Sequence, residues 1–374
     1  MFSRGSSIFL GFFLSCVVCS CRFAATDIRY EQERKTDVTP SLVRVVDSDW
    51  NFNRIGEAPN YRTSVYGTCS KDGVCWSWSS RSIDVIDRSG AWRRIFELAS
   101  DDHDPINRVH LYSSRIAWMV RNSGLYKTID GGADWQRITV FSLDNREGAI
   151  WDVHFRNEQL GWVVGGKYEA RPSIPEVNNA LSDDRKRVLV GCILKTTDGG
   201  ITWQTQEVKR TIGRFTEILF WNDNIGMAFG DAGCMLTRTG GTHWTDIGKS
   251  LKIDKTGDRN SVLSASFINQ HHGWVLLGGS ELMVTSDAGK SWRPVDDSRG
   301  APPDNLAEIS FLTLHDGLAI SDRLTGGRLF KTIDGGKTWN QIFSEEKFYS
   351  ITFHQSERRV LWGDSGIYTV SKKN

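Results

Sequence analysis

A short stretch that ends in tryptophan recurs along this chain and constrains its fold more than any other feature. Each copy has a few apolar or β-branched residues, an Asp-Gly-Gly-type turn, and usually Thr or Ser before the tryptophan. Asp can hydrogen-bond within its own turn and Gly adopts positive φ at little cost, so the pattern predicts a β-hairpin. The five clear copies, beginning with LYKTIDGGADW, end at Trp135, Trp203, Trp244, Trp292 and Trp339. A weaker copy, VIDRSGAW, ends at Trp92.

The spacing of these tryptophans predicts a β-propeller. Successive copies lie 41 to 48 residues apart, except that 68 residues separate Trp135 from Trp203. A period of about 40–50 residues with several short strands is typical of propeller blades of four antiparallel strands. The segment around Trp50 resembles the end of a repeat, and residues 349–370 resemble the first three strands of one. We therefore expect an all-β, seven-bladed propeller whose ring is closed by pairing the N-terminal strand with the C-terminal three strands, which removes exposed sheet edges.

The N-terminal region differs from the repeats. Arg4 precedes an apolar run that is short for a membrane-spanning helix, so residues 1–25 are interpreted as a secretory signal peptide. Val18-Cys19-Ser20-Cys21 resembles a bacterial lipobox, with Cys21 as the residue that would be lipidated; the alternative is ordinary cleavage after Ala25. We expect an exported protein, in the periplasm or anchored to a bacterial envelope membrane. Residues 26–42 are polar and indicate a flexible tether, and a single propeller domain is expected at 43–374, with an insertion at 166–190.

Charge and cysteine content narrow the function. The formal net charge is +1, so composition predicts no nucleic-acid partner, and membrane contact is expected only through a lipid anchor. The mature part has no CxxC pattern, P-loop or dinucleotide-binding motif, so we expect no metal and no cofactor. Cys69 and Cys75 flank a turn and are candidates for a disulfide. Cys192 and Cys234 occupy the same position in neighbouring blades, and geometry must decide whether they pair.

The turns resemble the Asp-box, or BNR repeat, whose pattern is Ser/Thr-x-Asp-x-Gly-x-Thr/Ser-Trp. The aspartates of this pattern are Asp130, Asp198, Asp287 and Asp334. In the copy that ends at Trp244, Thr239 takes their place. A second signature alternates with the boxes, as in Leu160-Gly161-Trp162 and His272-Gly273-Trp274. Together they resemble the photosystem II assembly and stability factor-like family of Asp-box propellers, over roughly residues 43 to 374.

This resemblance carries expectations about function. Members of the family are exported propellers, and the best-known one assists the assembly of a membrane complex and is not an enzyme. The resemblance therefore implies a monomeric, non-enzymatic scaffold that binds a protein partner or aids assembly of an envelope complex. It also implies that the Asp-boxes are structural and do not define the function. An envelope immunity or inhibitor protein is another binding role that the sequence allows.

Polar residues recur along the first strand of each blade. We align these strands on their last large residues, Tyr66, Leu111, Phe155, Phe220, Phe267, Phe311 and Phe353. Three positions earlier the residues are nearly all polar, and alternation along a strand places them on one side, bordering the central channel. The charged members of this ring are Arg108, Asp152, Glu217 and Glu308. They form the candidate binding site.

The ring has two interpretations. Two carboxylates across an open pocket could be the acid and base of a glycoside hydrolase, as in Asp-box sialidases or xyloglucan-degrading enzymes. The sialidase motif Phe/Tyr-Arg-Ile-Pro is missing, because Tyr61-Arg62 is followed by Thr-Ser. The structural alternative, which we favour, has polar residues meeting channel water and Arg108 paired with Asp152. Salt-bridged carboxylates would exclude the enzyme.

Loops on one face are the remaining candidates. The insertion is expected to open on the face opposite the Asp-box turns, which makes that face the expected recognition surface. A tolerated surface loop is the alternative. The acidic run Asp101-Asp102-His103-Asp104 could chelate a cation, although such loops are more often part of a solvated rim.

Overall fold

The computed structural model describes most of the chain between residues 47 and 373. The described residues are 47, 49–57, 66–70, 74–86, 92–122, 124–140, 148–170, 187–208, 213–231, 233–251, 262–278, 281–295, 303, 305–321, 327–342, 347–354, 358–363 and 366–373. The predicted signal peptide, Cys21 and the predicted tether lie outside them. Across the described ranges every regular element is a β-strand, and no helix there is long and apolar enough to cross a bilayer.

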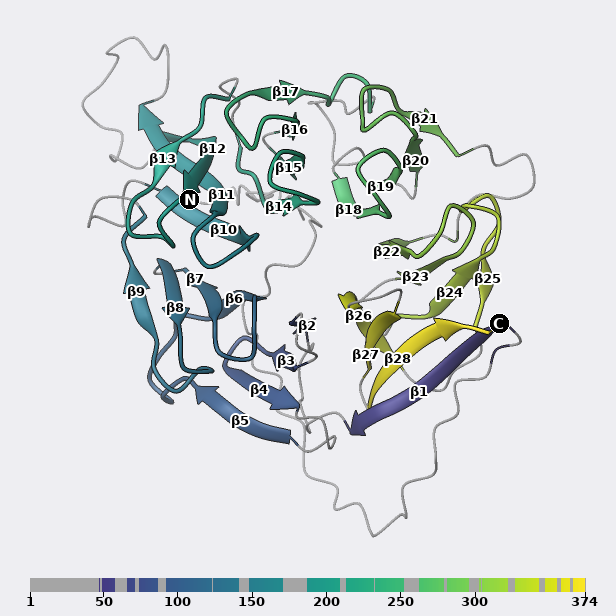
Figure 1. The fold of residues 1–374 in the computed structure, drawn as a ribbon, viewed down its shortest axis with the longest axis horizontal. Coiled ribbons are helices and arrows are strands. Elements are labelled where there is room, and N and C mark those ends of the chain that lie inside the picture. Colours follow the sequence, from purple (N-terminus) through teal and green to yellow (C-terminus); the bar gives the residue numbers. More distant parts are fainter. Residues whose placement is uncertain are drawn as a thin grey trace, which may run out of the picture.

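The strands form seven antiparallel sheets of four strands each, arranged around a common axis (Figure 1). The predicted seven-bladed propeller is confirmed. Blades 1 to 3 consist of β2 (Tyr66–Cys69), β3 (Cys75–Trp78), β4 (Ser82–Ile86) and β5 (Trp92–Glu97); β6 (Ile106–Leu111), β7 (Ala117–Arg121), β8 (Gly124–Thr128) and β9 (Gln136–Ile138); and β10 (Gly148–Phe155), β11 (Gly161–Ala170), β12 (Arg187–Thr196) and β13 (Gln204–Thr205). Blades 4 to 6 consist of β14 (Glu217–Phe220), β15 (Gly226–Gly230), β16 (Gly233–Thr237) and β17 (Trp244–Asp246); β18 (Val262–Phe267), β19 (Gly273–Leu277), β20 (Leu282–Thr285) and β21 (Arg293–Pro294); and β22 (Leu306–Phe311), β23 (Gly317–Ser321), β24 (Leu329–Thr332) and β25 (Asn340–Gln341).

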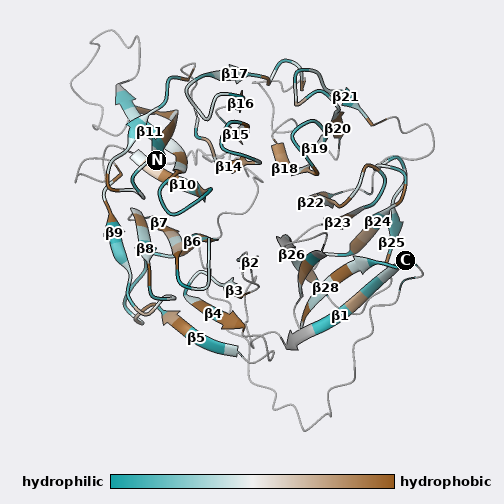
Figure 2. Cartoon of the chain, in the orientation of Figure 1, coloured by the Kyte–Doolittle hydropathy of each residue, from teal (hydrophilic) through white to brown (hydrophobic). Residues whose placement is uncertain are grey.

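Blade 7 closes the ring with strands that are far apart in the sequence. It consists of β26 (Phe348–His354), β27 (Arg358–Gly363), β28 (Gly366–Lys372) and β1 (Trp50–Glu57). β1 runs antiparallel to β28, with Trp50 opposite Lys372. The purple and yellow strands lie side by side there in Figure 1, and in Figure 2 polar and apolar bands alternate along both. The predicted closure is therefore confirmed.

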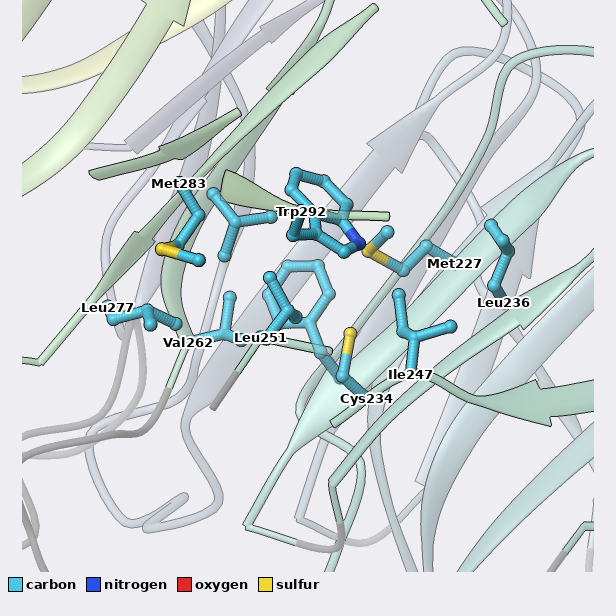
Figure 3. Close-up of a cluster of buried hydrophobic side chains, with 11 residues drawn as sticks. Met227, Cys234, Leu236, Ile247, Leu251, Val262, Leu277, Met283 and Trp292 are labelled. Carbon is cyan, nitrogen blue, oxygen red and sulfur yellow. The ribbon is translucent and has the colours of Figure 1, made fainter. Parts of the chain in front are cut away.

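The core consists of apolar layers between neighbouring blades. Figure 3 shows the layer between blades 4 and 5, where Met227 and Cys234 meet Val262 and Met283. At three other blade contacts a phenylalanine of an inner strand stacks on a tryptophan of the preceding blade. The pairs and their centroid distances are Phe155 on Trp118 (3.6 Å), Phe220 on Trp162 (3.6 Å) and Phe311 on Trp274 (3.9 Å). Such stacks add to the stabilisation that burial of the rings provides.

The glycine of the second signature makes room for this phenylalanine. A Cβ at Gly161 would lie 2.5 Å from the ring of Phe155, and one at Gly273 would lie 1.9 Å from that of Phe267. In both blades the phenylalanine precedes the glycine by six residues. A side chain at the glycine would therefore displace the ring from the contact between blades.

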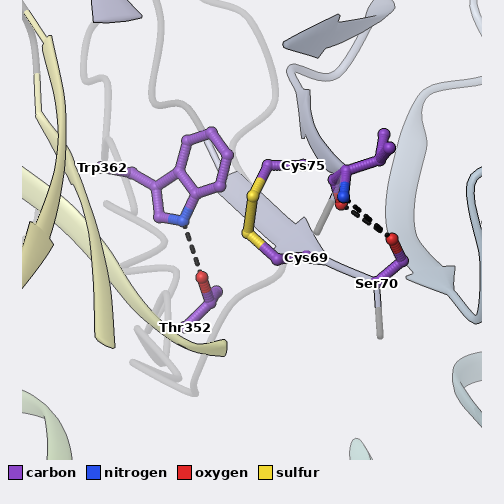
Figure 4. The surroundings of a disulfide bond; sticks show 6 residues. Cys69, Ser70, Cys75, Thr352 and Trp362 are labelled. Carbon is purple, nitrogen blue, oxygen red and sulfur yellow. Dashed lines mark hydrogen bonds between the residues drawn. A yellow bond between two sulfur atoms is a disulfide. The ribbon is translucent and has the colours of Figure 1, made fainter. Parts of the chain in front are cut away.

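In blade 1 a disulfide occupies the positions that the phenylalanine and the glycine hold in the other blades. Cys69 and Cys75 are also six residues apart and are joined by an S–S bond of 2.04 Å. The turn between them has the backbone bond of the other blades, from Ser70 N to Val74 O, which matches the bond from Arg156 N to Leu160 O. Trp362 of blade 7 lies beside the disulfide (Figure 4). The alignment on Tyr66 was therefore wrong by three residues, because a disulfide replaces the large side chain that the alignment required.

The other two cysteines of the mature chain do not pair. Cys192 lies in the apolar layer between blades 2 and 3, and Cys234 lies in the layer between blades 4 and 5. Burial raises the pKa of the Cys192 thiol to about 12. Thr196 and Thr237 hold the same place in their boxes, and Cys192 lies four residues before the first whereas Cys234 lies three before the second. The expected equal position was therefore wrong by one residue, and alternation turns Cys192 toward blade 2 and Cys234 toward blade 5, where both act as small apolar groups.

The insertion in blade 3 is in part a longer hairpin. β11 and β12 remain paired beyond the expected strand ends, with Lys167 opposite Val190 and Ala170 opposite Arg187. The bounds 166–190 therefore include strand residues at both ends, while 171–186 lie outside the described residues. The extension is held to blade 4, because Gly213 N donates to Leu189 O at 2.9 Å.

Each intact Asp-box closes its turn with the same bonds. In blade 6, Asp334 accepts hydrogen bonds from Thr332 Oγ1 at 2.9 Å, Thr338 N at 2.9 Å and Thr338 Oγ1 at 2.6 Å. In blade 3, the bonds from Thr202 lower the pKa of Asp198 to about 2. Thr239 in blade 4 accepts a bond from His243 N at 2.9 Å through its hydroxyl. Each of the boxes in the described residues, those of blades 2 to 6, therefore clamps the two ends of its turn, and the aspartates make the larger set of bonds.

We expect Asp334→Ala to lower the free energy of unfolding by about 1–3 kcal/mol, because three bonds to one carboxylate are lost. The reverse change in blade 4, Thr239→Asp, should raise the denaturation midpoint because it restores the complete box. Chemical denaturation followed by tryptophan fluorescence measures both. Since the pKa of Asp334 is lowered from its ordinary 3.8, the effect of Asp334→Ala should be full above that value and decline as pH falls through the lowered pKa. An effect of equal size in strong acid would contradict this account.

Reduction of the disulfide should lower the free energy of unfolding by about 2 kcal/mol, the loop-closure value for so short a loop. The double variant Cys69→Phe/Cys75→Gly gives blade 1 the pair that blades 3 to 6 use. We expect it to recover part of the loss and to be insensitive to reductant, whereas Cys69→Ala/Cys75→Ala should stay destabilised. Equal midpoints for the two double variants would show that the disulfide does not replace the Phe–Gly contact.

Candidate functional site

Three of the four charged ring residues follow irregularities in the inner strands. The register of pairing shifts immediately before Arg108, Asp152 and Glu308. The same shift precedes Ser264 and Ser350. A β-bulge adds one residue to a strand and redirects the side chain that follows it. In the corrected register Tyr66 takes the ring position of blade 1.

Arg108 joins three neighbouring blades through its guanidinium group. Its Nε lies 2.9 Å from Asp152 Oδ1, and its Nη2 lies 3.1 Å from Glu217 Oε1. Arg108 comes from β6 of blade 2, Asp152 from β10 of blade 3 and Glu217 from β14 of blade 4. Three of the four predicted residues are thus brought together, whereas Glu308 lies in blade 6, on β22.

Asp152 is almost fully buried and is bonded on both oxygens. It is 2% exposed. Beyond Arg108, it accepts hydrogen bonds from Val153 N at 2.9 Å and from Ile218 N of blade 4 at 3.0 Å. A carboxylate held by a guanidinium and two amides is unavailable to bind water or a sugar. The structure therefore gives Asp152 the role of joining blades.

Other polar residues of the inner strands contact the next blade in the same way. Ser264 Oγ accepts from Ile309 N at 3.2 Å, and Ser266 Oγ accepts from Phe311 N at 2.8 Å. His110 Nε2 lies 3.1 Å from both the backbone nitrogen and the carbonyl oxygen of Phe155. Inner strands have one edge without a neighbouring strand, and an unpaired buried N–H is costly. Polar side chains of one blade satisfy the edge of the next.

This geometry does not fit acid–base catalysis by Asp152 and Glu217. A glycoside hydrolase needs two carboxyl groups about 5–9.5 Å apart that face a sugar. Here both carboxylates bind one guanidinium, with Asp152 buried beneath it. These two residues therefore belong to a structural ion-pair network.

The acidic run between blades 1 and 2 binds an arginine. Arg121 Nη2 lies 2.6 Å from Asp102 Oδ2, and Arg121 Nε lies 3.3 Å from Asp104 Oδ2. Hydrogen bonds from the backbone of Asp104 and from Arg121 lower the pKa of Asp102. No group of three or more potential metal-binding side chains occurs among the described residues. The run anchors its loop to the end of β7.

The sequence interpretation missed an ion pair that replaces an Asp-box in blade 7. Lys331 Nζ lies 2.7 Å from Asp47 Oδ2 and 2.5 Å from Asp49 Oδ2. The corresponding Lys127 of blade 2 donates to Gly199 O in the Asp-box turn of the next blade, at 3.2 Å. Asp47-Ser48-Asp49-Trp50 therefore takes the place of a box, as its position before a tryptophan could have indicated.

The face opposite the Asp-boxes carries paired aromatic and basic groups beside the extended hairpin. The guanidinium of Arg214 lies 4.9 Å from the centre of the Trp151 ring, and that of Arg187 lies 5.8 Å from the Tyr168 ring. Trp151 is the extra residue of the bulge before Asp152. Tryptophan, tyrosine and arginine dominate many protein interfaces.

Comparison with known proteins identifies relatives of this chain. No family model matches it. The photosystem II assembly protein Ycf48 of Synechococcus sp. (strain JA-3-3Ab) is 26% identical over 275 residues, which cover 67% of this chain and 79% of the relative. The photosystem II assembly lipoprotein Ycf48 of Nostoc sp. (strain PCC 7120) is 24% identical over 267 residues, which cover 65% of this chain and 76% of the relative. The chain is therefore similar to these Ycf48 proteins over about two thirds of its length, which agrees with the expected resemblance to the photosystem II assembly and stability factor-like family.

Solved structures share the fold. A structure described as YCF48 bound to D1 peptide has a TM-score of 0.58 and 15% identity, and the match covers 89% of this chain and all of that one. Virginiamycin B lyase from Staphylococcus aureus has a TM-score of 0.59 and 12% identity, over 86% of this chain and 99% of the lyase. A binding protein and an enzyme thus share this propeller, and the fold alone does not assign a function.

Substitution of Arg108 should test whether the ring network is structural. We expect Arg108→Met to lower the free energy of unfolding by about 2–3 kcal/mol, because Asp152 remains buried without its cation. The double variant Arg108→Met/Asp152→Asn should recover most of this loss, because the buried charge is removed as well. Urea denaturation of the four proteins of this cycle measures the coupling. Additive losses would contradict the proposed dependence of Asp152 on Arg108.

Proposed function

We propose that the protein is an exported, non-enzymatic propeller that binds a protein partner and aids assembly of a complex in a bacterial cell envelope. The observation that supports this most directly is its relationship to the Ycf48 proteins, which are named as photosystem II assembly factors. A YCF48 structure is described with a bound D1 peptide. The Arg108 network adds support, because it leaves Asp152 and Glu217 bonded within the ring.

We place recognition on the face opposite the Asp-boxes. Tyr168 is 39% exposed and Arg187 is exposed on the extended hairpin. Aromatic and guanidinium groups suit a protein interface because they combine apolar area with hydrogen bonding. The β11–β12 ladder and the bond from Gly213 N to Leu189 O hold the described part of this hairpin in place, which limits the conformational entropy that it loses on binding.

We further propose that residues 1–25 direct export and that Cys21 carries a lipid anchor. The lipobox-like Val18–Cys21 stretch supports this, and two relatives are named lipoproteins. Globomycin, which blocks lipoprotein signal processing, should cause the precursor to accumulate. Unchanged processing would contradict lipidation of Cys21.

Affinity capture from detergent-solubilised envelopes tests the binding function. We expect the wild-type protein to retain a defined protein partner, and Tyr168→Ala/Arg187→Ala to retain at least about tenfold less, as for loss of interface hot spots. Ile201→Ser on the Asp-box face is the matched control and should retain the partner. Equal retention by both variants would move the interface elsewhere, and hydrolysis of envelope polysaccharide by the purified protein would contradict the non-enzymatic proposal.

A further inference from the structure

Exposed apolar side chains gather at one end of the propeller. We call this end the Asp-box face; it comprises the Asp-box turns and the turns between the first and second strands of each blade. Five large apolar side chains are exposed among the described residues, and four of them lie on this face. They are Ile129 (61%), Ile201 (82%), Leu314 (46%) and Ile333 (52%). The fifth, Tyr168, lies on the extended hairpin at the opposite end.

Two of these side chains belong to adjoining turns at the tip of blade 6. Leu314 belongs to the turn between β22 and β23, and Ile333 precedes Asp334 in the Asp-box. The two turns are bonded to each other, because Gly335 N donates to His315 O at 2.8 Å. The backbone positions of the two turns are therefore fixed relative to each other. Both side chains expose apolar surface to water, and burial in an apolar medium would lower the free energy of that surface.

The chain enters the propeller on this same face. β1 begins at Trp50, opposite Lys372 at the end of β28. Asp47 and Asp49 are held there by Lys331, which directly precedes the Asp-box of blade 6. The segment between Cys21 and Asp47 has 25 residues, and it joins the propeller at this point of entry. A lipid on Cys21 would therefore lie near the Asp-box face of blades 6 and 7.

Around the tip of blade 6 the carboxylates of Asp47 and Asp49 are paired with Lys331, and the charged residues left exposed in the neighbouring Asp-boxes are lysines. Lys337 is exposed within the same Asp-box, and Lys290 is exposed in the box of blade 5. The exposed acidic residues of this face lie on the other side of the ring, in blades 2 to 4; they are Asp130, Asp134, Glu158 and Asp223. Anionic lipid headgroups attract lysines that are exposed at the surface.

We propose that the Asp-box face, with the tip of blade 6 foremost, rests on an anionic lipid surface. Leu314 and Ile333 enter the headgroup layer, and Lys337 and Lys290 bind lipid phosphates. Apolar side chains at separate turn tips can each insert into a lipid headgroup layer. A stable protein–protein interface instead buries about 800 Å² of surface on each partner. This proposal rests on the proposed anchor at Cys21, and it turns the extended hairpin away from the membrane.

Vesicle binding tests the intrinsic affinity of this face without the anchor. The protein is the mature chain that starts at position 21 with Cys21→Ser, which retains every described residue. The vesicles contain phosphatidylglycerol and phosphatidylethanolamine without protein, so the result is independent of the proposed partner. We expect measurable partition at low salt and a loss of at least about fivefold for Leu314→Gln/Ile333→Gln, because two half-exposed apolar side chains no longer insert. Lys337→Gln/Lys290→Gln should lower vesicle binding at low salt by a similar factor. At high salt this variant and the parent protein should bind equally, because salt screens the attraction of the lysines to the lipid.

Tyr168→Gln on the opposite face is the matched control and should bind vesicles like the parent protein. A second measurement uses an environment-sensitive fluorophore on Leu314→Cys and, separately, on Tyr168→Cys, in the lipid-anchored protein. A lipid-phase quencher should reach the first probe and not the second. Absence of partition, an equal loss for Tyr168→Gln, or quenching of the Tyr168→Cys probe would each overturn the proposal.

Discussion

The inner strand of every blade has one edge that no other strand covers, and the ring depends on how that edge is satisfied. Asp152, Ser264 and Ser266 each accept a hydrogen bond from a backbone N–H of the following blade. Stacked rings such as Phe155 on Trp118 fill the space behind these bonds. The polar ring around the axis is therefore part of the packing between blades. A charged channel in a propeller is weak evidence for a catalytic site when its carboxylates are bonded in this way.

Much of this fold could be predicted because the same hairpin sequence pattern recurs in most of the blades. The Asp-Gly-Gly turns and the tryptophan spacing indicate hairpins, their number and the closure of the ring. The prediction failed where one blade reaches the same geometry with different chemistry. Cys69 and Cys75 replace a phenylalanine and a glycine, so an alignment on large side chains selected Tyr66. The constant spacing of six residues was the signal that would have placed Cys69 correctly.

The candidate site was harder to predict than the fold. Alternation placed Arg108, Asp152 and Glu217 on one side of their strands, and the structure joins them in one network. The bulges before Arg108 and Asp152 cannot be read from alternation, and neither can the burial of Asp152, because both depend on the neighbouring blade. Cys192 and Cys234 depend on register in the same way. An offset of one residue relative to their Asp-boxes turns the two thiols toward different neighbouring blades.

The closure of the ring has a mechanical consequence. The chain enters β1 at Trp50 and the ladder with β28 runs from there to Glu57. A pull on the N-terminal side along the direction of β1 loads the hydrogen bonds of this ladder together in shear, whereas a pull across the strand would break them one after another from Trp50. Force along β1 is therefore shared by the whole ladder that completes the ring.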